Sequence, residues 1–205
     1  MNTDIDTYSF TKRLKEETKE NHKILDTHYF VKSIFSSGAV NEEKSDDTAT
    51  TGYYLDLHLL MLNEIQLILK ESLYQFPEYF KEFNKDYDKQ HEVNNDIINY
   101  KSVISLINKL HSDSRNKELL LSHMYIWWLG VLYGGQMIKR SITKRNPHLL
   151  DYTNLIFNFS CNTKTFIFDF KEYLENSINN QDHFIDNVNE VYLLIQDVFD
   201  ELTNK

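Results

Sequence analysis

Residues 123–140 read HMYIWWLGVLYGGQMIKR, and this stretch decides the fold. Its apolar residues recur at helical spacing, and it carries both tryptophans and three of the chain's five glycines. A glycine inside a helix costs roughly 1 kcal/mol relative to alanine. Three glycines within six residues therefore predict either a helix that bends or a helix whose backbone another group approaches closely. The first interpretation is tight helix packing, and the second is a flat ligand lying across the helix.

The apolar spacing elsewhere in the chain is helical as well, and no internal repeat is present. Helices are expected over residues 9–27, 52–73, 77–87, 96–111, 117–143, 163–179 and 183–202. Residues 1–7 are expected to be a flexible N-terminus. Residues 8–205 are expected to form one domain, in which the polar stretch 36–51 is a mobile loop. The sequence predicts an all-α, single-domain helical bundle.

Composition excludes several classes of protein. The 205 residues are 41% hydrophobic with a net charge of −9, which is typical of a globular chain and does not favour direct nucleic-acid binding. The sequence contains no run of about 18 apolar residues, so no membrane span is expected. Cys161 is the only cysteine, so no intrachain disulfide forms, and the histidines lack zinc-site spacing. The N-terminal residues have no leader-like pattern, so any leader would lie outside this sequence.

Residues 14–22 read LKEETKENH, and together with residues 123–140 they resemble two motifs of the haem oxygenases. In that family the motif Leu-Lys-Glu-x-Thr-Lys-x-x-His carries the axial iron ligand. The motif His-x-Tyr-x-x-x-Leu-Gly-Asp-x-Ser-Gly-Gly-Gln lies over the other haem face. Here His22 stands in the ligand position, with Lys15 and Lys19 beside it. The second motif is matched at His123, Tyr125, Leu129, Gly130, Gly134, Gly135 and Gln136.

The resemblance implies a haem oxygenase-like bundle with a glycine-kinked distal helix. If haem binds, it implies that His22 is the iron ligand, and that the haem-binding residues are His22, Lys15, Lys19, Tyr125, Gly130 and Gly134. The asparagine- and lysine-rich composition is most similar to the divergent haem oxygenase-like proteins of apicomplexan parasites. That similarity implies a plastid-type organelle, the apicoplast, as the location.

Three residues between or just before the glycines depart from the family motif. Val131 stands where the family has an aspartate that holds a proton-delivering water network, and valine has neither donor nor acceptor. Tyr133 replaces a small serine in a region where the family leaves room for haem and oxygen, and Trp127 replaces an arginine. These three substitutions argue against the family reaction.

The late helix that carries the family's cationic partners for the haem carboxylates is also altered. Residues 165–172 read TFIFDFKE, so aromatic or acidic residues replace these partners unless Lys164 or Lys171 substitutes in a shifted register. The sequence therefore predicts a catalytically degenerate pseudoenzyme with no catalytic residue. Haem would not be required, and any haem binding would be weak or vestigial. The role would be noncatalytic, through contacts with an unidentified protein partner in the organelle.

Two alternatives remain open. The first is an active haem oxygenase that cleaves haem to biliverdin, carbon monoxide and iron, with His22 as ligand and another group replacing the aspartate. The second is a haem carrier or sensor that uses His22. Both haem-binding alternatives differ from the noncatalytic interpretation in one geometric respect. They require that space for a porphyrin remains between His22 and residues 130–135, whereas aromatic side chains that fill this space would argue against them.

Overall fold

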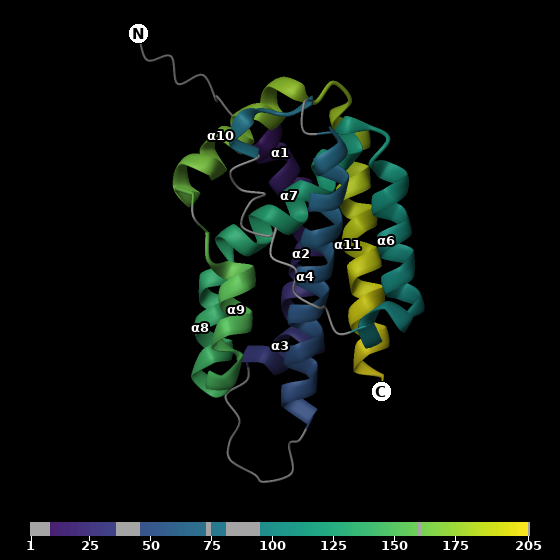
Figure 1. Ribbon diagram of the computed structural model, residues 1–205. Helices are drawn as coiled ribbons and strands as arrows, with labels where there is room; N and C mark the ends of the chain where they lie inside the picture. The colour runs from purple at the N-terminus through teal and green to yellow at the C-terminus, as the bar shows by residue number, and fades with distance from the viewer. Residues whose placement is uncertain (1–8, 36–45, 73–74, 81–94, 160, 205) are drawn as a thin grey trace.

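The computed structural model describes residues 9–35, 46–72, 75–80, 95–159 and 161–204 (Figure 1). Within these residues the regular structure is helical and contains no strand, so the predicted all-α single domain is confirmed. None of the described helices is long and apolar enough to cross a membrane. The predicted flexible N-terminus, residues 36–45 of the predicted loop and most of the predicted helix 77–87 lie outside the described residues.

The α-helices of the described residues are α1 (Ser9–Glu17), α2 (Lys19–Thr27), α3 (Tyr29–Phe35), α4 (Asp46–Ser72), α6 (Lys101–Asp113), α7 (Lys117–Tyr133), α8 (Gly135–Arg145), α9 (Leu150–Phe157), α10 (Thr163–Ser177) and α11 (Gln181–Thr203). Two short 3₁₀ helices, η3 (Asn95–Asn99) and η4 (Pro147–Leu149), precede α6 and α9. In Figure 1, α11 and α6 run side by side along one edge, and α8 and α9 form the opposite edge.

Two predicted boundaries are wrong. Residues 9–27 form two helices, because the buried Thr18 hydroxyl donates to the Leu14 carbonyl (2.8 Å), and such i−4 bonds bend helices. Helix α4 begins at Asp46, so residues 46–51 of the predicted loop are helical. Thr51 is buried, and packing there outweighs the polar composition on which the loop was predicted.

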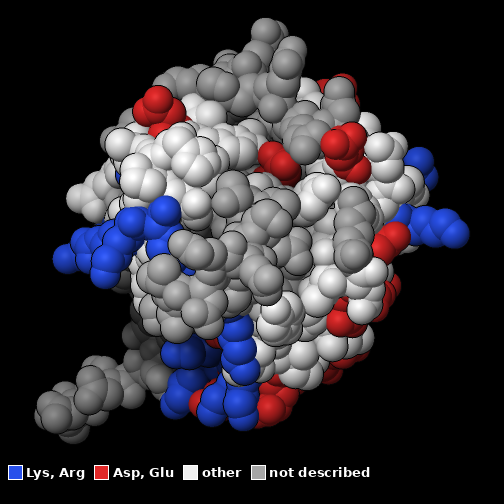
Figure 2. Space-filling model, turned by 90° about the horizontal axis from the view of Figure 1, so that it is seen from below, with Lys and Arg blue, Asp and Glu red and all other residues white. Residues whose placement is uncertain are grey.

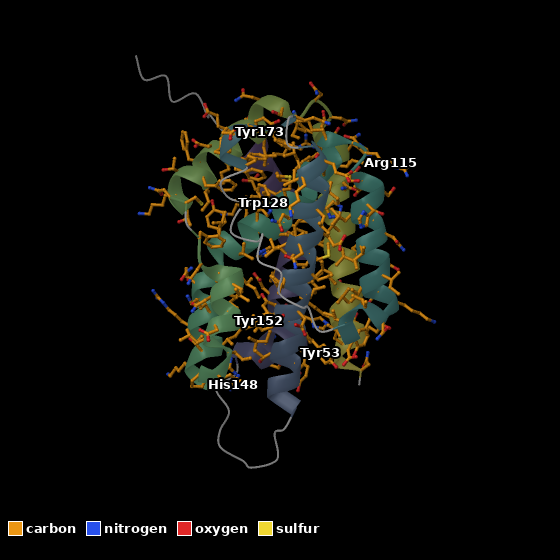
Figure 3. The ribbon with its side chains drawn as sticks, in the orientation of Figure 1. Tyr53, Arg115, Trp128, His148, Tyr152 and Tyr173 are labelled. Carbon is orange, nitrogen blue, oxygen red and sulfur yellow. The ribbon has the colours of Figure 1, made fainter. Side chains whose placement is uncertain are left out.

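Helix α7 crosses the centre of the bundle and is buried on nearly all sides, as its apolar composition requires. Trp128 is fully buried and packs against Phe80 (ring centroids 5.4 Å apart), Phe166 (5.7 Å) and Phe170 (5.9 Å). Figure 3 shows Trp128 in the upper part of the molecule, where α7 meets α10. This aromatic cluster fixes α7 on α10.

The chain changes direction at Gly134, where α7 ends and α8 begins, so the predicted kink is confirmed (Figure 1). A Cβ atom on Gly135 would lie 2.5 Å from the Phe157 ring of α9, so this glycine serves close packing. A Cβ atom on Gly130 would meet nothing within 4 Å. The glycines therefore fit both interpretations of the sequence, since Gly135 permits close packing and Gly130 leaves open space.

Carboxylates from distant helices hold two helix N-termini. Glu175 of α10 accepts hydrogen bonds from the backbone N–H groups of Phe10 (3.1 Å) and Thr11 (2.7 Å) and from the Thr11 hydroxyl (3.0 Å). Glu201 of α11 accepts from the backbone N–H (2.9 Å) and hydroxyl (2.5 Å) of Ser102 in α6. These bonds satisfy N–H groups that a helix leaves unpaired, and they fasten α1 to α10 and α6 to α11.

Candidate functional site

A cleft of about 400 Å³ opens between α1 and α10. Helix α1 supplies Lys12 and Lys15, which lie three residues apart and so share one face of the helix. Helix α10 supplies Lys164 and Lys171, which are two helical turns apart. The remaining lining residues are Thr11, Ile167 and Phe168. The cleft therefore combines four ammonium groups with an apolar wall.

Three of these lysines have no carboxylate partner. Within the described residues, Lys15, Lys164 and Lys171 form no ion pair, whereas the neighbouring Arg13 pairs with Glu17 (2.6 Å) and Asp182 (2.5 Å). Like charges that line one cleft repel one another unless an anion binds between them. The arrangement fits an anionic ligand that also has an apolar surface.

The structure corrects the predicted loss of cationic partners on the late helix. Lys164 and Lys171 line the same cleft as Lys15, so both are placed where the shifted register, left open as an alternative, would need them. Lys19 is exposed on α2, beyond the bend at Thr18, and does not line the cleft. Lys12 was not predicted; its position three residues before Lys15 was the available signal.

His22 lies on α2 with 56% of its side chain exposed. Its Nδ1 atom is 3.0 Å from a carboxylate oxygen of Asp26, one helical turn later, and its ring contacts Tyr192 edge to face (centroids 5.8 Å apart). The hydrogen bond to Asp26 raises the pKa of His22, although burial opposes the shift. Since a carboxylate only accepts, Nδ1 carries the proton, and in the neutral imidazole Nε2 keeps its lone pair. A histidine that ligates a metal typically has this arrangement.

The donor set suits a haem iron better than a protein-held metal. In the described parts of the chain, no group of three or more histidine, cysteine or acidic side chains is placed to hold a metal ion. Among the described residues His22 is therefore a single possible ligand, and a metal ion bound to it would need further ligands from outside the protein. Iron held in a porphyrin meets that condition.

Tyr125, from the second motif, lies close to the bend that precedes His22. Burial raises the pKa of Tyr125, and the neighbouring Thr18 hydroxyl, four residues before His22, acts in the opposite direction. The two motifs found in the sequence are therefore neighbours at this point.

Tyr133 and Val131 lie between the glycines, and Tyr133 was expected to occupy the space for a ligand. Tyr133 is 58% exposed and turns away from the core, so its bulk does not fill the space beside Gly130. The Nζ atom of Lys171 lies 5.2 Å from the centroid of the Tyr133 ring. Val131 is buried, and its side chain supplies neither donor nor acceptor. The exposed Gly130 backbone remains open.

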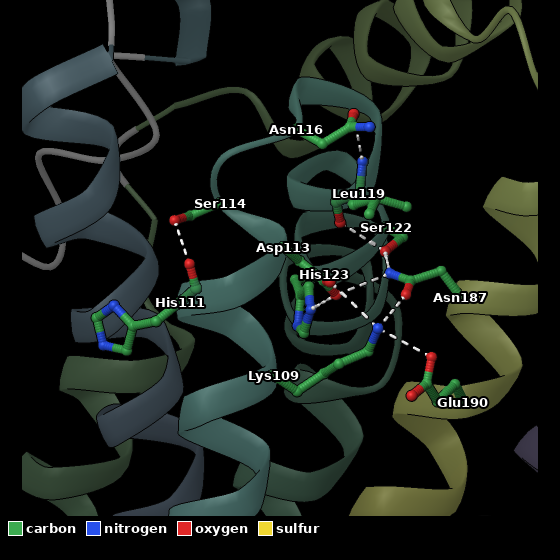
Figure 4. A network of polar contacts seen from close by, with 10 residues as sticks. All are labelled: Lys109, His111, Asp113, Ser114, Asn116, Leu119, Ser122, His123, Asn187 and Glu190. Carbon is green, nitrogen blue, oxygen red and sulfur yellow. Dashed lines mark hydrogen bonds and ion pairs between the residues drawn. The ribbon is translucent and has the colours of Figure 1, made fainter.

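His123, the first residue of the second motif, belongs to a buried polar network (Figure 4). Its Nε2 atom is 2.8 Å from Asp113, which also accepts from Lys109 (3.1 Å) and Asn187 (3.0 Å). Burial lowers the pKa of His123 despite the pull of Asp113, and the nearby charge of Lys109 acts in the same direction as burial. The network joins α6, α7 and α11. The role of His123 is therefore structural.

Comparisons with known proteins agree with this geometry. A sequence model described as "Heme oxygenase" matches residues 8–201. The structure is similar to haem oxygenase from Leptospira interrogans, with a TM-score of 0.71 and 21% identity over 94% of this chain and 99% of that one. It is also similar to haem oxygenase-1 of the cyanobacterium Synechocystis in complex with haem, with a TM-score of 0.69 and 21% identity over 95% and 92%. No curated protein sequence matches the chain.

These findings overturn the prediction that the protein is not an enzyme. The matched family and both structural neighbours are haem oxygenases, and none of the findings supports a catalytically degenerate protein. The expectation that no cofactor is required loses its support as well, because one neighbour is a haem complex. The special likeness to apicomplexan proteins stays a prediction. From residue 8 to residue 201, the chain belongs to the haem oxygenase family.

Proposed function

We propose that this protein is a haem oxygenase that binds haem between His22 and residues 130–134 and cleaves it to biliverdin, carbon monoxide and iron. The observation that carries the proposal is the set of unpaired lysines around one cleft, Lys15, Lys164 and Lys171. Haem is a planar apolar molecule with two carboxylates, and the cleft offers ammonium groups beside an apolar wall. Charge-assisted bonds to carboxylates are among the strongest hydrogen bonds in proteins.

His22 and Asp26 would hold the iron side of the ligand. The Nδ1–H group of His22 would donate to Asp26, which would fix the ring and leave Nε2 of the neutral imidazole to bind the iron. Bound haem would supply the iron that activates dioxygen. Tyr125, a neighbour of Thr18, would lie beside the ligand where α7 passes the α1–α2 bend.

Proton delivery is the step in which this chain departs from its family. Val131 is buried and cannot hold a water molecule. The exposed backbone at Gly130 leaves space above it, so water entering from the solvent would bring the proton. A positioned acid typically contributes 10²–10⁴-fold to such a step. We therefore expect slow turnover rather than none.

The test is a haem titration followed by a turnover assay. The wild type should bind one equivalent of haem with a Soret band that His22→Ala shifts or abolishes. The matched control is His148→Ala, because His148 is exposed at the lower end of the molecule, away from α1 and α2 (Figure 3). With ascorbate and dioxygen, the wild type and His148→Ala should form biliverdin and His22→Ala should not.

Two outcomes would count against the proposal. Absence of haem binding by the wild type would reject the site itself. Stoichiometric binding through His22 without biliverdin would reject the enzymatic part and identify a haem carrier or sensor. The apicoplast location and the unidentified protein partner stay predictions from the resemblance, and neither affects this test.

A further inference from the structure

Tyr133 and Lys171 bring the end of the kinked helix and the wall of the cleft together. Tyr133 is the last residue of α7, and the Nζ atom of Lys171 lies 5.2 Å from its ring centroid. Within about 6 Å of a ring face, an ammonium group is attracted by the electrons of the ring. The contact therefore holds one of the cleft lysines through a residue that does not itself line the cleft.

Without this contact, two effects would favour conformations in which the Lys171 side chain lies outside the cleft. Its neighbours Lys15 and Lys164 carry the same charge, and Lys171 forms no ion pair with a described carboxylate. A lysine side chain also has several freely rotating bonds, so fixing it in one conformation costs conformational entropy. The attraction of the Tyr133 ring offsets part of this entropy loss in the ligand-free protein. Preorganisation of this kind raises affinity for the ligand that uses the lysine.

The apolar surroundings of Lys171 indicate what kind of ligand it faces. Phe168 lies one turn before Lys171, lines the cleft and is 53% exposed. Exposed aromatic rings from two helices therefore border this part of the cleft, Phe168 of α10 in its lining and Tyr133 of α7 against the Lys171 ammonium group. A flat apolar ligand that ends in a carboxylate matches this arrangement.

We propose that Tyr133 is a positioning residue that holds the Lys171 ammonium group in the cleft before a ligand binds. Its effect on haem binding rests on the proposed function, because a haem carboxylate must reach Lys171 for the effect to be seen. The holding of Lys171 by Tyr133 does not depend on haem, and it is testable in the ligand-free protein.

The ligand-free test uses the ring current of Tyr133. Reductive methylation with ¹³C-formaldehyde labels lysines as dimethylammonium groups, which keep their charge, and Lys171→Arg assigns the signal of Lys171. That signal should lie upfield of the other lysines in the wild type and in Tyr133→Phe, and should return to their range in Tyr133→Ser. An unshifted signal in the wild type would overturn the proposal, whatever the result with haem.

The ligand test compares haem with haem dimethyl ester in Soret titrations. Tyr133→Phe keeps the ring and should bind both ligands as the wild type does. Tyr133→Ser should bind haem about two- to fivefold more weakly, the range expected for an exposed cation–π contact, and should bind the diester unchanged. Lys171→Met should also weaken binding of haem alone, and Tyr133→Ser should add little to it.

Equal weakening of both ligands by Tyr133→Ser would mean that the ring contacts the porphyrin directly, which would overturn the positioning role. Additive effects of the two substitutions would overturn it as well. A wild type that binds neither ligand would reject the proposed function and the effect of Tyr133 on haem binding, while the ring-current shift would still decide whether Tyr133 holds Lys171.

Discussion

The two motif histidines have opposite environments, although both stand at family positions. His22 is exposed beside Asp26, which raises its pKa, whereas burial lowers the pKa of His123. The sequence favoured His22 as the ligand through the motif alone. The spacing of Asp26, one turn after His22, was a readable signal for a held imidazole. The role of His123 was not readable, because its partners Lys109 and Asn187 come from other helices.

Asp26→Ala should weaken haem binding and change the titration of His22. Removing the carboxylate frees the imidazole to rotate, and loss of such a partner typically costs 10–100-fold in metal affinity. In the ligand-free protein the pKa of His22 should fall towards its ordinary value, since the hydrogen bond to Asp26 is the largest cause of the increase. NMR titration of the histidine Cε1–H signals and a haem titration give the two results. An unchanged His22 pKa would show that Asp26 does not hold the ring.

His58 should make the protein less stable in mild acid. Burial lowers its pKa to about 4, and Nδ1 lies 2.9 Å from the Tyr54 carbonyl. The unfolded chain takes up a proton near pH 6.5 and the folded protein does not, so the free energy of unfolding falls as the pH drops from 6.5 towards 4. Between pH 7.5 and 5.5 we expect a loss of about 1 kcal/mol from this group.

Urea unfolding at the two pH values measures this loss. His58→Asn should have a smaller pH dependence, and His148→Asn, at an exposed position, should behave as the wild type. His123 should contribute in the same direction, because burial also lowers its pKa. Equal pH dependence in His58→Asn and the wild type would contradict the assignment.

At the scale of the helix, the sequence predicted elements better than their ends. The positions of α6, α7, α10 and α11 follow from apolar spacing, and the kink follows from the glycines. The bend at Thr18 was not predicted, because it depends on whether a threonine hydroxyl bonds its own helix or another group. The cleft was missed because it joins α1 to α10, which lie about 150 residues apart in the chain, and no local pattern shows that pairing.

Two alanine substitutions should separate the roles of the glycines. Gly135→Ala would place a Cβ atom 2.5 Å from the Phe157 ring and should destabilise the protein by about 1–3 kcal/mol. Gly130→Ala meets no neighbour and should stabilise the ligand-free protein by up to about 1 kcal/mol, since alanine favours helix. Denaturation with and without haem distinguishes them. If Gly130 faces the ligand, Gly130→Ala should lose part of the stabilisation that haem gives.

Glu175→Ala should disturb the cleft as well as the fold. It removes the acceptor for the N–H groups at the start of α1, the helix that carries Lys12 and Lys15. The free energy of unfolding should fall by about 1–2 kcal/mol. Glu201→Ala is the matched control, because it removes the same kind of cap from α6, which does not line the cleft. Both variants should lose stability, and only Glu175→Ala should bind haem more weakly at a temperature where both are folded.

At the scale of the whole molecule, the net charge of −9 conceals local basic regions. In the view from below, most lysine and arginine side chains gather at the left and lower edges, and most acidic ones lie along the right side and the top (Figure 2). Helix α8 carries Lys139, Arg140, Lys144 and Arg145. Composition alone therefore describes the interactions of this chain poorly, because a summed charge does not record which side chains the fold places together.

The position of Trp127 and Trp128 has a practical consequence. Both indoles are buried in α7, within three residues of Gly130, and a helix rises about 1.5 Å per residue. They are the only tryptophans in the chain, so its ultraviolet emission originates next to the proposed haem site. A porphyrin that settles over Gly130 would accept their excitation energy and quench that emission. The unmodified protein thus carries its own optical probe of occupancy.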